Sequence, residues 1–387
     1  MVTAPFDRTP VADPAALGID PAALDELYTR VQRDVDDGRM PSCQLALARD
    51  GKVAVWKSFG AAAPDSRYVI FSATKPIVAG AVWVLIGEGA INPSDRVATM
   101  IPEFASNGKD AITIEQVLLH TSGFPRAPFS ALDWDDKERR LARLAKWRTN
   151  WEPGTRYEYH PTSAHWVLAE LIERATGGDF RSFIRTRILD PNGLAGLQVG
   201  VPAEQQADIN ELVLTGTAMT TDEIQAALGI PELPVTEVTP DALVSFNQPA
   251  IRAVGVPGGG GISTAADLAL YYQALLHDPA GIWKPDVRAD VTGNVRNTMA
   301  DYIGTPANRT IGLVVAGSDG RSNARGMGRT VSPRAFGHNG AGGQIAWADP
   351  DTGLSFCYLT NGLDQHQLRE WRRTTAIASR AANCVVT

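Results

Sequence analysis

Ser72 and Lys75 are the residues whose types and spacing point most directly to chemistry. They stand three apart in Ser72-Ala73-Thr74-Lys75, at the start of an apolar stretch that predicts a helix. Residues at this spacing share one face of a helix, so the lysine amine can reach the serine hydroxyl. Burial and the positive potential of the helix N-terminus can lower the pKa of such a lysine until it serves as a base. We therefore predict Ser72 as a nucleophile and Lys75 as its base.

The same S-x-x-K pattern occurs a second time, at Ser106-Asn107-Gly108-Lys109. There the Asn-Gly pair favours a turn, and no helical pattern follows that would align the two side chains. For the first copy, the alternative explanation is that Ser72 only caps a helix and Lys75 is a surface charge. The helical context of Ser72 separates the two copies and favours the first as the functional one.

Several familiar site patterns are absent from the sequence. There is no G-x-S-x-G, H-E-x-x-H, G-x-G-x-x-G or G-x-x-x-x-G-K motif. The six histidines show no ligand spacing with carboxylates, so we expect no metal and no cofactor. Cys43, Cys357 and Cys384 are widely scattered, so we expect no disulfide framework. The run Gly258–Gly261 could cradle an anion, but it lacks the lysine and the context of a phosphate loop.

Composition narrows the choice of partners and compartment. The 387 residues carry a net charge of −7, and their basic residues are 29 Arg and only 7 Lys. No basic stripe is visible, so a nucleic-acid partner is not expected. The first 20 residues lack a signal-peptide pattern, and no stretch approaches the ~18 apolar residues of a membrane span. We expect a cytoplasmic protein with a small-molecule substrate and no membrane partner, and leave its oligomeric state open.

Strand patterns occur near both ends of the chain, and helical patterns fill the middle. Asp50-Gly51 predicts a type I′ turn between the first two strands. The predicted strands are residues 44–48, 53–56, 68–71, 311–315, 344–348 and 354–359. The predicted helices are residues 21–38, 72–87, 114–120, 137–147, 161–176, 180–189, 221–228, 264–276 and 364–382.

Two or three strands rarely bury enough apolar surface alone, so the strands of both ends are expected to share one sheet. We predict an α/β (α+β) fold in which an antiparallel sheet is flanked by the terminal helices. Residues 1–75 and 250–387 would form this discontinuous sheet domain. Residues 76–249 would form a mostly helical domain inserted into it.

Five blocks of the sequence, in the same order, resemble the serine β-lactamase and penicillin-binding protein superfamily. Within it, they are most similar to the class C-like branch that includes family VIII carboxylesterases. The resemblance covers about residues 20 to 380 and implies the β-lactamase/transpeptidase-like fold. Its blocks are Phe71–Pro76 (FSATKP), Leu118–Phe124 (LLHTSGF), Trp151–Leu168 (WEPGTRYEYHPTSAHWVL), Gly258–Leu276 (GGGGISTAADLALYYQALL) and Gly337–Gly343 (GHNGAGG).

The resemblance also implies roles for individual residues. Tyr159 takes the place of the tyrosine in the family's Y-x-N motif, where a phenol near a lysine exchanges protons with the serine and the leaving group. Tyr157 is the competing candidate. The oxyanion hole would be formed by the backbone N–H groups of Ser72 and Ala341. His338-Asn339-Gly340 matches the third motif, K-T-G or H-x-G, whose strand forms the opposite wall of the site.

Two departures from the family bear on the substrate. Pro161 replaces the asparagine of Y-x-N and offers no side-chain donor or acceptor, and His338 replaces the lysine of K-T-G and is mostly neutral at pH 7. Both changes weaken recognition of a charged peptide-like substrate and leave the acylation residues intact. We therefore expect a serine hydrolase, a carboxylesterase for esters of small or medium acyl chains.

Three other functions stay open from the sequence. The first is a β-lactamase or D,D-peptidase, and the second is an acyltransferase or amide hydrolase that uses the same Ser-Lys-Tyr site. The third is a non-catalytic binding relic of the fold, which the presence of Ser72, Lys75 and Tyr159 disfavours. The sequence leaves open whether Lys75 or Tyr159 is the resting base, because strongly interacting groups titrate as a pair.

Overall fold

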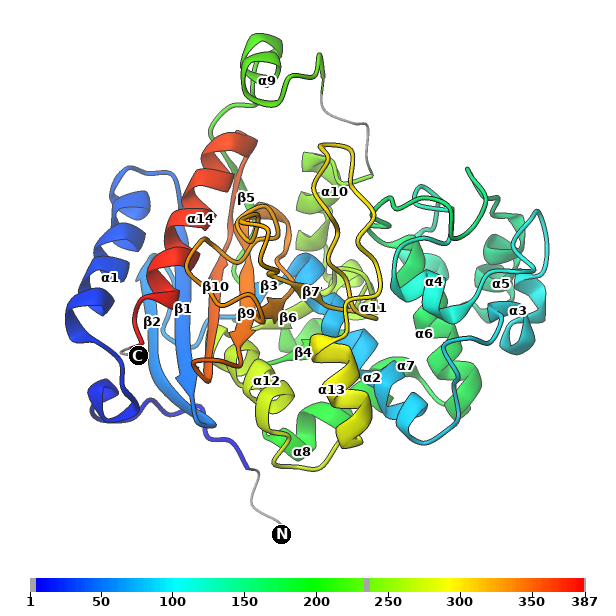
Figure 1. The fold of residues 1–387 in the computed structure, drawn as a ribbon, viewed down its shortest axis with the longest axis horizontal. Coiled ribbons are helices and arrows are strands. Elements are labelled where there is room, and N and C mark those ends of the chain that lie inside the picture. Colours follow the sequence, from blue (N-terminus) through cyan, green and yellow to red (C-terminus); the bar gives the residue numbers. More distant parts are fainter. Residues whose placement is uncertain (1–4, 233–236, 386–387) are drawn as a thin grey trace.

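A six-stranded antiparallel sheet joins the two ends of the chain in the computed structural model, which describes residues 5–232 and 237–385. Its strand order is β2-β1-β10-β9-β8-β7, so strands far apart in sequence lie side by side (Figure 1). The strands are β1 (Ser42–Arg49), β2 (Lys52–Gly60), β7 (Val314–Val315), β8 (Phe336–Gly337), β9 (Ile345–Asp349) and β10 (Leu354–Thr360). The predicted sheet built from both ends is confirmed.

The β1–β2 hairpin has the turn that its sequence predicts. Asp50 has φ 52° and Gly51 has φ 74°, both in the left-handed region that a type I′ turn requires. β1 lies inside the sheet, between β2 and β10, and its side chains from Ser42 to Ala48 are all buried. Both faces of the sheet must therefore be covered by other elements.

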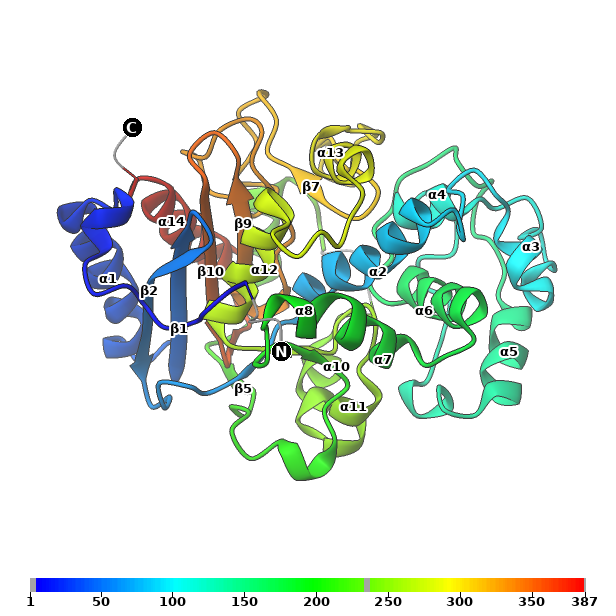
Figure 2. The ribbon, with the colours of Figure 1, turned by 90° about the horizontal axis from the view of Figure 1, so that it is seen from below.

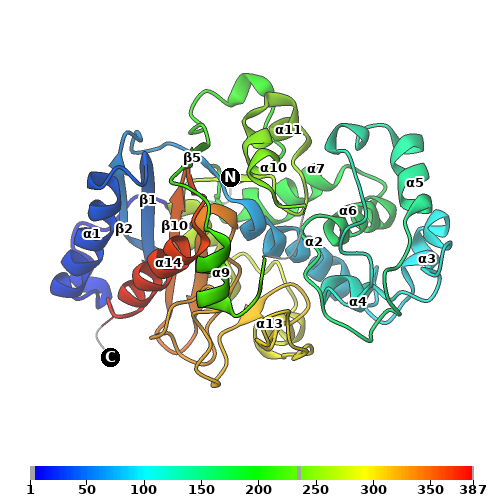
Figure 3. The ribbon, with the colours of Figure 1, turned by 90° about the horizontal axis from the view of Figure 1, so that it is seen from above.

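Helices from opposite ends of the chain cover one face of this sheet. α1 (Pro21–Asp36) and α14 (Gln367–Ala382) pack side by side, and Leu27, Val31 and Ile377 join the sheet's apolar side chains in one core (Figure 3). α12 (Ala265–His277) covers the other face, against β1, β9 and β10 (Figure 2). The sheet is thus the middle layer of three.

The middle of the chain is mostly helical. Its apolar side chains continue without a break into the core beneath α12, because α2 is buried along almost its whole length between the two regions. The domain boundaries at residues 76 and 249 stay a prediction, and residues 1–4, 233–236 and 386–387 of the predicted domains lie outside the described part. The helices here are α2 (Lys75–Gly87), α3 (Val97–Met100), α4 (Ile114–Leu118), α5 (Lys137–Lys146), α6 (Ser163–Thr176), α7 (Phe180–Ile184), α8 (Asp190–Asn192), α9 (Thr221–Leu228), α10 (Pro240–Val244) and α11 (Pro249–Val254), and α13 (Pro285–Gly293) follows α12.

Some predicted boundaries of strands and helices differ from those in the structure. The strand predicted at residues 311–315 is only Val314–Val315, because Gly312, at φ 124°, turns the chain just before it. The final helix begins at Gln367 and not near residue 364, because β11 (Gly362–Asp364) pairs with β5 (Val213–Thr215). The small third sheet consists of β3 (Tyr68–Val69), β4 (Gln198–Val199) and β6 (Gly261–Ser263). In the described part of the chain, no helix is long and apolar enough to cross a membrane.

One buried glutamine ties the layers together. The Gln273 side chain on α12 accepts a hydrogen bond from the backbone N–H of Gly51 at 2.9 Å. Its Nε2 donates to the carbonyl oxygens of Ala48 and Gly353, each at 3.0 Å, and to the Ser355 hydroxyl at 3.0 Å. It therefore joins α12 to the β1–β2 and the β9–β10 hairpins, which come from opposite ends of the sequence.

We predict that Gln273→Leu destabilises the fold. The substitution leaves buried backbone groups without partners, at a cost of about 2 to 3 kcal/mol in the free energy of unfolding. Thermal unfolding followed by circular dichroism should show a midpoint several degrees lower. Gln32→Leu is the matched control, because Gln32 is exposed and bonds only to Asp36. Equal midpoints for the two variants would contradict this role of Gln273.

Candidate active site

Ser72 lies on a tight turn directly before α2. Phe71–Thr74 form one turn of 3-10 helix, and Phe71 has a positive φ of 44°, which is uncommon for a bulky residue. The Thr74 hydroxyl donates to the Phe71 carbonyl at 2.6 Å and accepts from the Gly261 N–H at 2.8 Å. These bonds hold the strained backbone that presents Ser72 at the helix N-terminus.

The Lys75 amine is enclosed and reaches Ser72. The residue is 1% exposed, and its Nζ lies 3.3 Å from the Ser72 Oγ. Nζ also donates to the backbone carbonyls of Pro161 and Gly258, each at 2.6 Å. A Cβ atom at position 258 would lie 2.8 Å from the Pro161 oxygen, so only glycine allows this approach. The glycine run that sequence reasoning set aside therefore helps to position Lys75.

The surroundings of Lys75 favour its neutral form. Burial, followed by the positive charge of Arg309, holds the pKa of Lys75 well below its usual range, and Glu237 opposes them. Glu237 is engaged elsewhere, since one of its carboxylate oxygens accepts from the Thr162 N–H and hydroxyl at 2.9 and 2.8 Å. Among the described residues, Lys75 makes no ion pair. Lys75 is thus a buried amine in reach of a serine, and the alternative explanation of a surface charge is wrong.

Tyr159, and not Tyr157, is the tyrosine that lies against Lys75. The Lys75 Nζ is 5.0 Å from the centre of the Tyr159 ring, and the Tyr159 hydroxyl is buried without a hydrogen-bond partner of good geometry. Burial raises the pKa of Tyr159 to about 12, against the opposing effects of Arg309 and the Ser72 hydroxyl. The Tyr157 hydroxyl instead accepts from the Arg309 Nε at 3.1 Å. The structure thus brings Ser72, Lys75 and Tyr159 together.

Arg309 is the charged residue of this site that sequence reasoning missed. Its guanidinium lies 5.1 Å from the Tyr159 ring centre and 3.5 Å from the His338 Nε2, and the residue is 6% exposed. Within the described residues it has no carboxylate partner. Burial, then Arg309 and Lys75, hold the pKa of His338 well below its usual range, so this imidazole is neutral. The cation comes from a loop before β7 that carries no recognisable motif.

Ala341 and the predicted wall residues His338, Asn339 and Gly340 lie on one segment beside the Ser72 turn. A Cβ atom at Gly340 would lie 2.3 Å from the Ile70 carbonyl oxygen, so the segment passes close to the turn. Within the described part of the chain, the backbone N–H groups of Ser72 and Ala341 donate to no protein acceptor. The Asn339 side chain is exposed and lies against Gly326, so it is the His338 ring, 6.0 Å from that of Tyr159, that faces the site.

His120, His160 and the second S-x-x-K motif have structural roles. His160 Nε2 accepts from the Phe124 N–H at 3.2 Å, and His120 Nδ1 accepts from the His160 N–H at 3.2 Å. The Lys109 amine donates to the carbonyls of Ser106 and Trp147 at 2.7 and 2.6 Å, which closes a turn away from Tyr159. In the part that the structure describes, no group of His, Cys, Asp or Glu could hold a metal ion.

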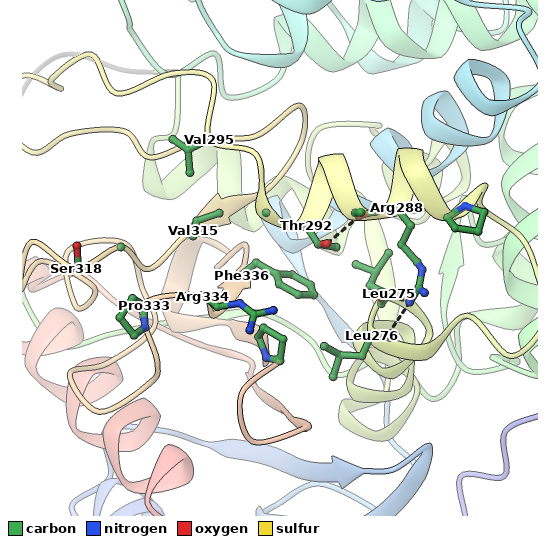
Figure 4. A pocket seen from close by; sticks show the side chains of 15 residues that line it. Leu275, Leu276, Arg288, Thr292, Val295, Val315, Ser318, Pro333, Arg334 and Phe336 are labelled. Carbon is green, nitrogen blue, oxygen red and sulfur yellow. Dashed lines mark hydrogen bonds between the residues drawn. The ribbon is translucent and has the colours of Figure 1, made fainter.

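A cavity of about 540 Å³ lies elsewhere, between α12, α13 and the β7–β8 edge of the sheet (Figure 4). Leu275, Val315 and Phe336 line it, together with Arg288, whose Nη1 donates to the Leu276 carbonyl at 2.5 Å. None of Ser72, Lys75 and Tyr159 borders this cavity. It is separate from the candidate active site.

Comparisons with known proteins identify the family of this chain. Residues 27–379 match the Beta-lactamase family model. The chain is 26% identical, over 82% of its length and 76% of the relative's, to "Esterase/beta-lactamase LipL" of Mycobacterium tuberculosis. Its fold is similar to that of a penicillin-binding protein homologue from Caulobacter crescentus, with a TM-score of 0.76 and 25% identity over 95% of this chain and 99% of that one. It is also similar to that of a family VIII carboxylesterase, with a TM-score of 0.74 and 26% identity over 94% of this chain and 99% of that one. The chain belongs to the beta-lactamase family.

Proposed function

We propose that this protein is a serine hydrolase that cleaves carboxylic esters of small or medium acyl chains through an acyl-enzyme on Ser72. The geometry of the Lys75 amine carries the proposal. A neutral amine has two N–H donors and one lone pair, and the carbonyls of Pro161 and Gly258 account for both donors. The lone pair is then left for the Ser72 hydroxyl at 3.3 Å. We propose this neutral amine as the resting base because its surroundings lower the pKa of Lys75, whereas Tyr159, with its raised pKa, rests as a neutral phenol.

Acylation then proceeds by proton transfer through this pair. Lys75 takes the Ser72 proton as Oγ attacks the ester carbonyl, and the C–O bond to the alcohol breaks when the tetrahedral intermediate collapses. Tyr159 gives its proton to the leaving alkoxide and regains one from the Lys75 ammonium. The unengaged N–H groups of Ser72 and Ala341 are suited to the oxyanion, and each such donor is worth about 3 to 4 kcal/mol.

Deacylation uses the same groups in the opposite direction. A water molecule loses a proton to the Lys75–Tyr159 pair and attacks the acyl carbon, and the carboxylic acid leaves as the Ser72 Oγ regains its proton. No further acid or base is required for this step. The cycle ends with the enzyme in its starting protonation state.

Apolar side chains next to the Ser72 turn support an acyl chain as the substrate group. Leu243, Val244, Phe246 and Ala341 are partly buried and pack against the cluster that contains Phe71. Phe246 meets Phe71 edge to face, with ring centres 5.5 Å apart. On the other side, the Pro161 carbonyl is taken up by Lys75, so position 161 offers nothing to a substrate amide. An apolar wall without an amide-binding group suits a simple ester.

The first test removes the nucleophile. We predict that Ser72→Ala abolishes the release of p-nitrophenol from p-nitrophenyl butyrate and the mass shift of the acyl-enzyme, because in the described residues Ser72 carries the one hydroxyl that is hydrogen-bonded to Lys75. Ser106→Ala removes the serine of the second S-x-x-K motif and should retain turnover. Hydrolysis that survives Ser72→Ala would refute the assignment.

The second test separates the two tyrosines. Tyr159→Phe removes the hydroxyl that serves the leaving group, and we expect kcat to fall about a hundred- to ten-thousandfold. Tyr157→Phe removes only a contact to Arg309, and its loss should be at least tenfold smaller. Steady-state kinetics with the same ester decide between them. Similar losses in both variants would contradict the role of Tyr159.

The third test concerns pH. Arg309 lowers the pKa of Lys75, so Arg309→Gln should raise that pKa. Because only neutral Lys75 accepts the Ser72 proton, kcat/KM falls as the pH drops through this pKa. The acid limb of the pH profile should therefore move to higher pH in Arg309→Gln and move less in Arg309→Lys, which keeps the charge. An unchanged acid limb would show that Arg309 does not act on the base.

Arg309 also favours a second candidate function. Its cation stands beside His338, at the wall where the family's third motif carries a lysine, and could attract an anionic substrate. A β-lactamase or D,D-peptidase activity would use such a charge. Turnover of nitrocefin or of a D-Ala-D-Ala peptide at a kcat/KM above that of p-nitrophenyl butyrate would select this function over the esterase.

A further inference from the structure

A second hollow, lined mainly by arginines, lies on the opposite side of the sheet from α12. It is formed where the C-terminal end of α1 meets the N-terminal end of α14, two helices that lie side by side (Figure 1 and Figure 3). Its volume is about 430 Å³. We call it the arginine pocket, after Arg30, Arg33, Arg39, Arg369, Arg372 and Arg373, which line it.

Acidic side chains neutralise only part of this charge. Asp34 pairs with Arg30 at 2.5 Å and with Arg39 at 3.8 Å, and Arg39 also reaches Asp37 at 3.2 Å. Asp364 pairs with Arg369 at 2.5 Å and with Arg373 at 3.3 Å. In the described residues, Arg33 and Arg372 have no ion pair. The six guanidinium groups thus share three carboxylates, in a chain whose net charge is −7.

Two further acids lie nearby and do not restore the balance. Glu223 lies 3.5 Å from the ring of His366, which also lines the pocket. Glu370 is close to Arg373, and burial raises the pKa of Glu370 to about 7, with Arg373 acting in the opposite direction. The group is therefore only partly ionised at neutral pH. Even when it is ionised, the positive charges of the pocket outnumber the negative ones.

Arg373 is the least exposed of the six arginines. Its side chain is 1% exposed, and its Nε is buried without any hydrogen-bond partner. Leaving a buried charged donor unpaired is costly, and such donors are rare in folded proteins. An anion in the pocket would offset this charge through the guanidinium groups of the neighbouring arginines that line the hollow.

The geometry points to a small polyanion with two or more phosphoryl or carboxylate groups as the ligand of the arginine pocket, and we propose this as a second binding site. Planar guanidinium groups match such oxyanions with paired hydrogen bonds. The arginines converge on a hollow and do not form a stripe, which favours a compact ligand over a nucleic-acid strand.

The test uses the full chain and measures binding of pyrophosphate by isothermal titration calorimetry at constant ionic strength. Inorganic phosphate and citrate are the comparison probes. We expect saturable one-to-one binding of pyrophosphate, at least tenfold tighter than that of phosphate, because two groups engage more arginines. Citrate binding within tenfold of pyrophosphate would assign the site to polyanions in general, and much weaker citrate binding would assign it to phosphoryl groups.

Variants at the rim connect the binding to the pocket. Arg33 and Arg372 are exposed, so Arg33→Gln and Arg372→Gln should fold normally, and each should weaken pyrophosphate binding about tenfold or more. Arg148→Gln is the matched control, because Arg148 is an exposed arginine outside the pocket and its loss should leave the affinity unchanged.

Three results would overturn the proposal. They are the absence of saturable pyrophosphate binding, an affinity that Arg33→Gln and Arg372→Gln do not change, and an equal loss in Arg148→Gln. Binding of a DNA oligonucleotide without binding of pyrophosphate would also overturn it, in favour of a macromolecular partner.

Discussion

The environment of the Lys75 amine is the constraint on which the rest of the site depends. Its nitrogen lies where three separate parts of the chain meet: the turn before α2, the segment that follows Tyr159, and the glycine run before β6. Two carbonyls fix the direction of its hydrogen bonds, and burial lowers its pKa. A base of this kind cannot be built from a local motif alone, because a lysine three residues after a serine is ordinarily solvated and charged.

The fold supplies that environment by closing the sheet with both ends of the chain. β1 and β10 are neighbours in this sheet. The segment from His338 to Ala341 runs next to the turn that carries Ser72. The helical middle of the chain then brings Pro161 and Tyr159 to the same place. The strained φ of Phe71 persists because Thr74 and Phe246 hold it from both sides, and the apolar core that continues around α2 provides the stability to maintain it.

Arginine is used in two different ways in this protein. In the candidate active site a single buried guanidinium, Arg309, has no acidic partner among the described residues and biases the protonation of Lys75, His338 and Tyr159. In the arginine pocket six of them gather at the surface between two helices. Arginine suits both uses because its guanidinium stays charged even when it is buried.

The sequence by itself determined the sheet built from both ends of the chain and the pairing of Ser72 with Lys75, and its resemblance to a known superfamily implied the fold and the role of Tyr159. These were readable because they depend on short-range patterns: a turn that requires positive φ at Asp50-Gly51, apolar periodicity, and the S-x-x-K spacing at Ser72. Only the tertiary structure decided that Tyr159 and not Tyr157 faces Lys75, that Gly258 is a partner of Lys75, and that Arg309 enters the site. These depend on contacts between residues far apart in the chain, and their geometry is set by packing, which a linear pattern does not record.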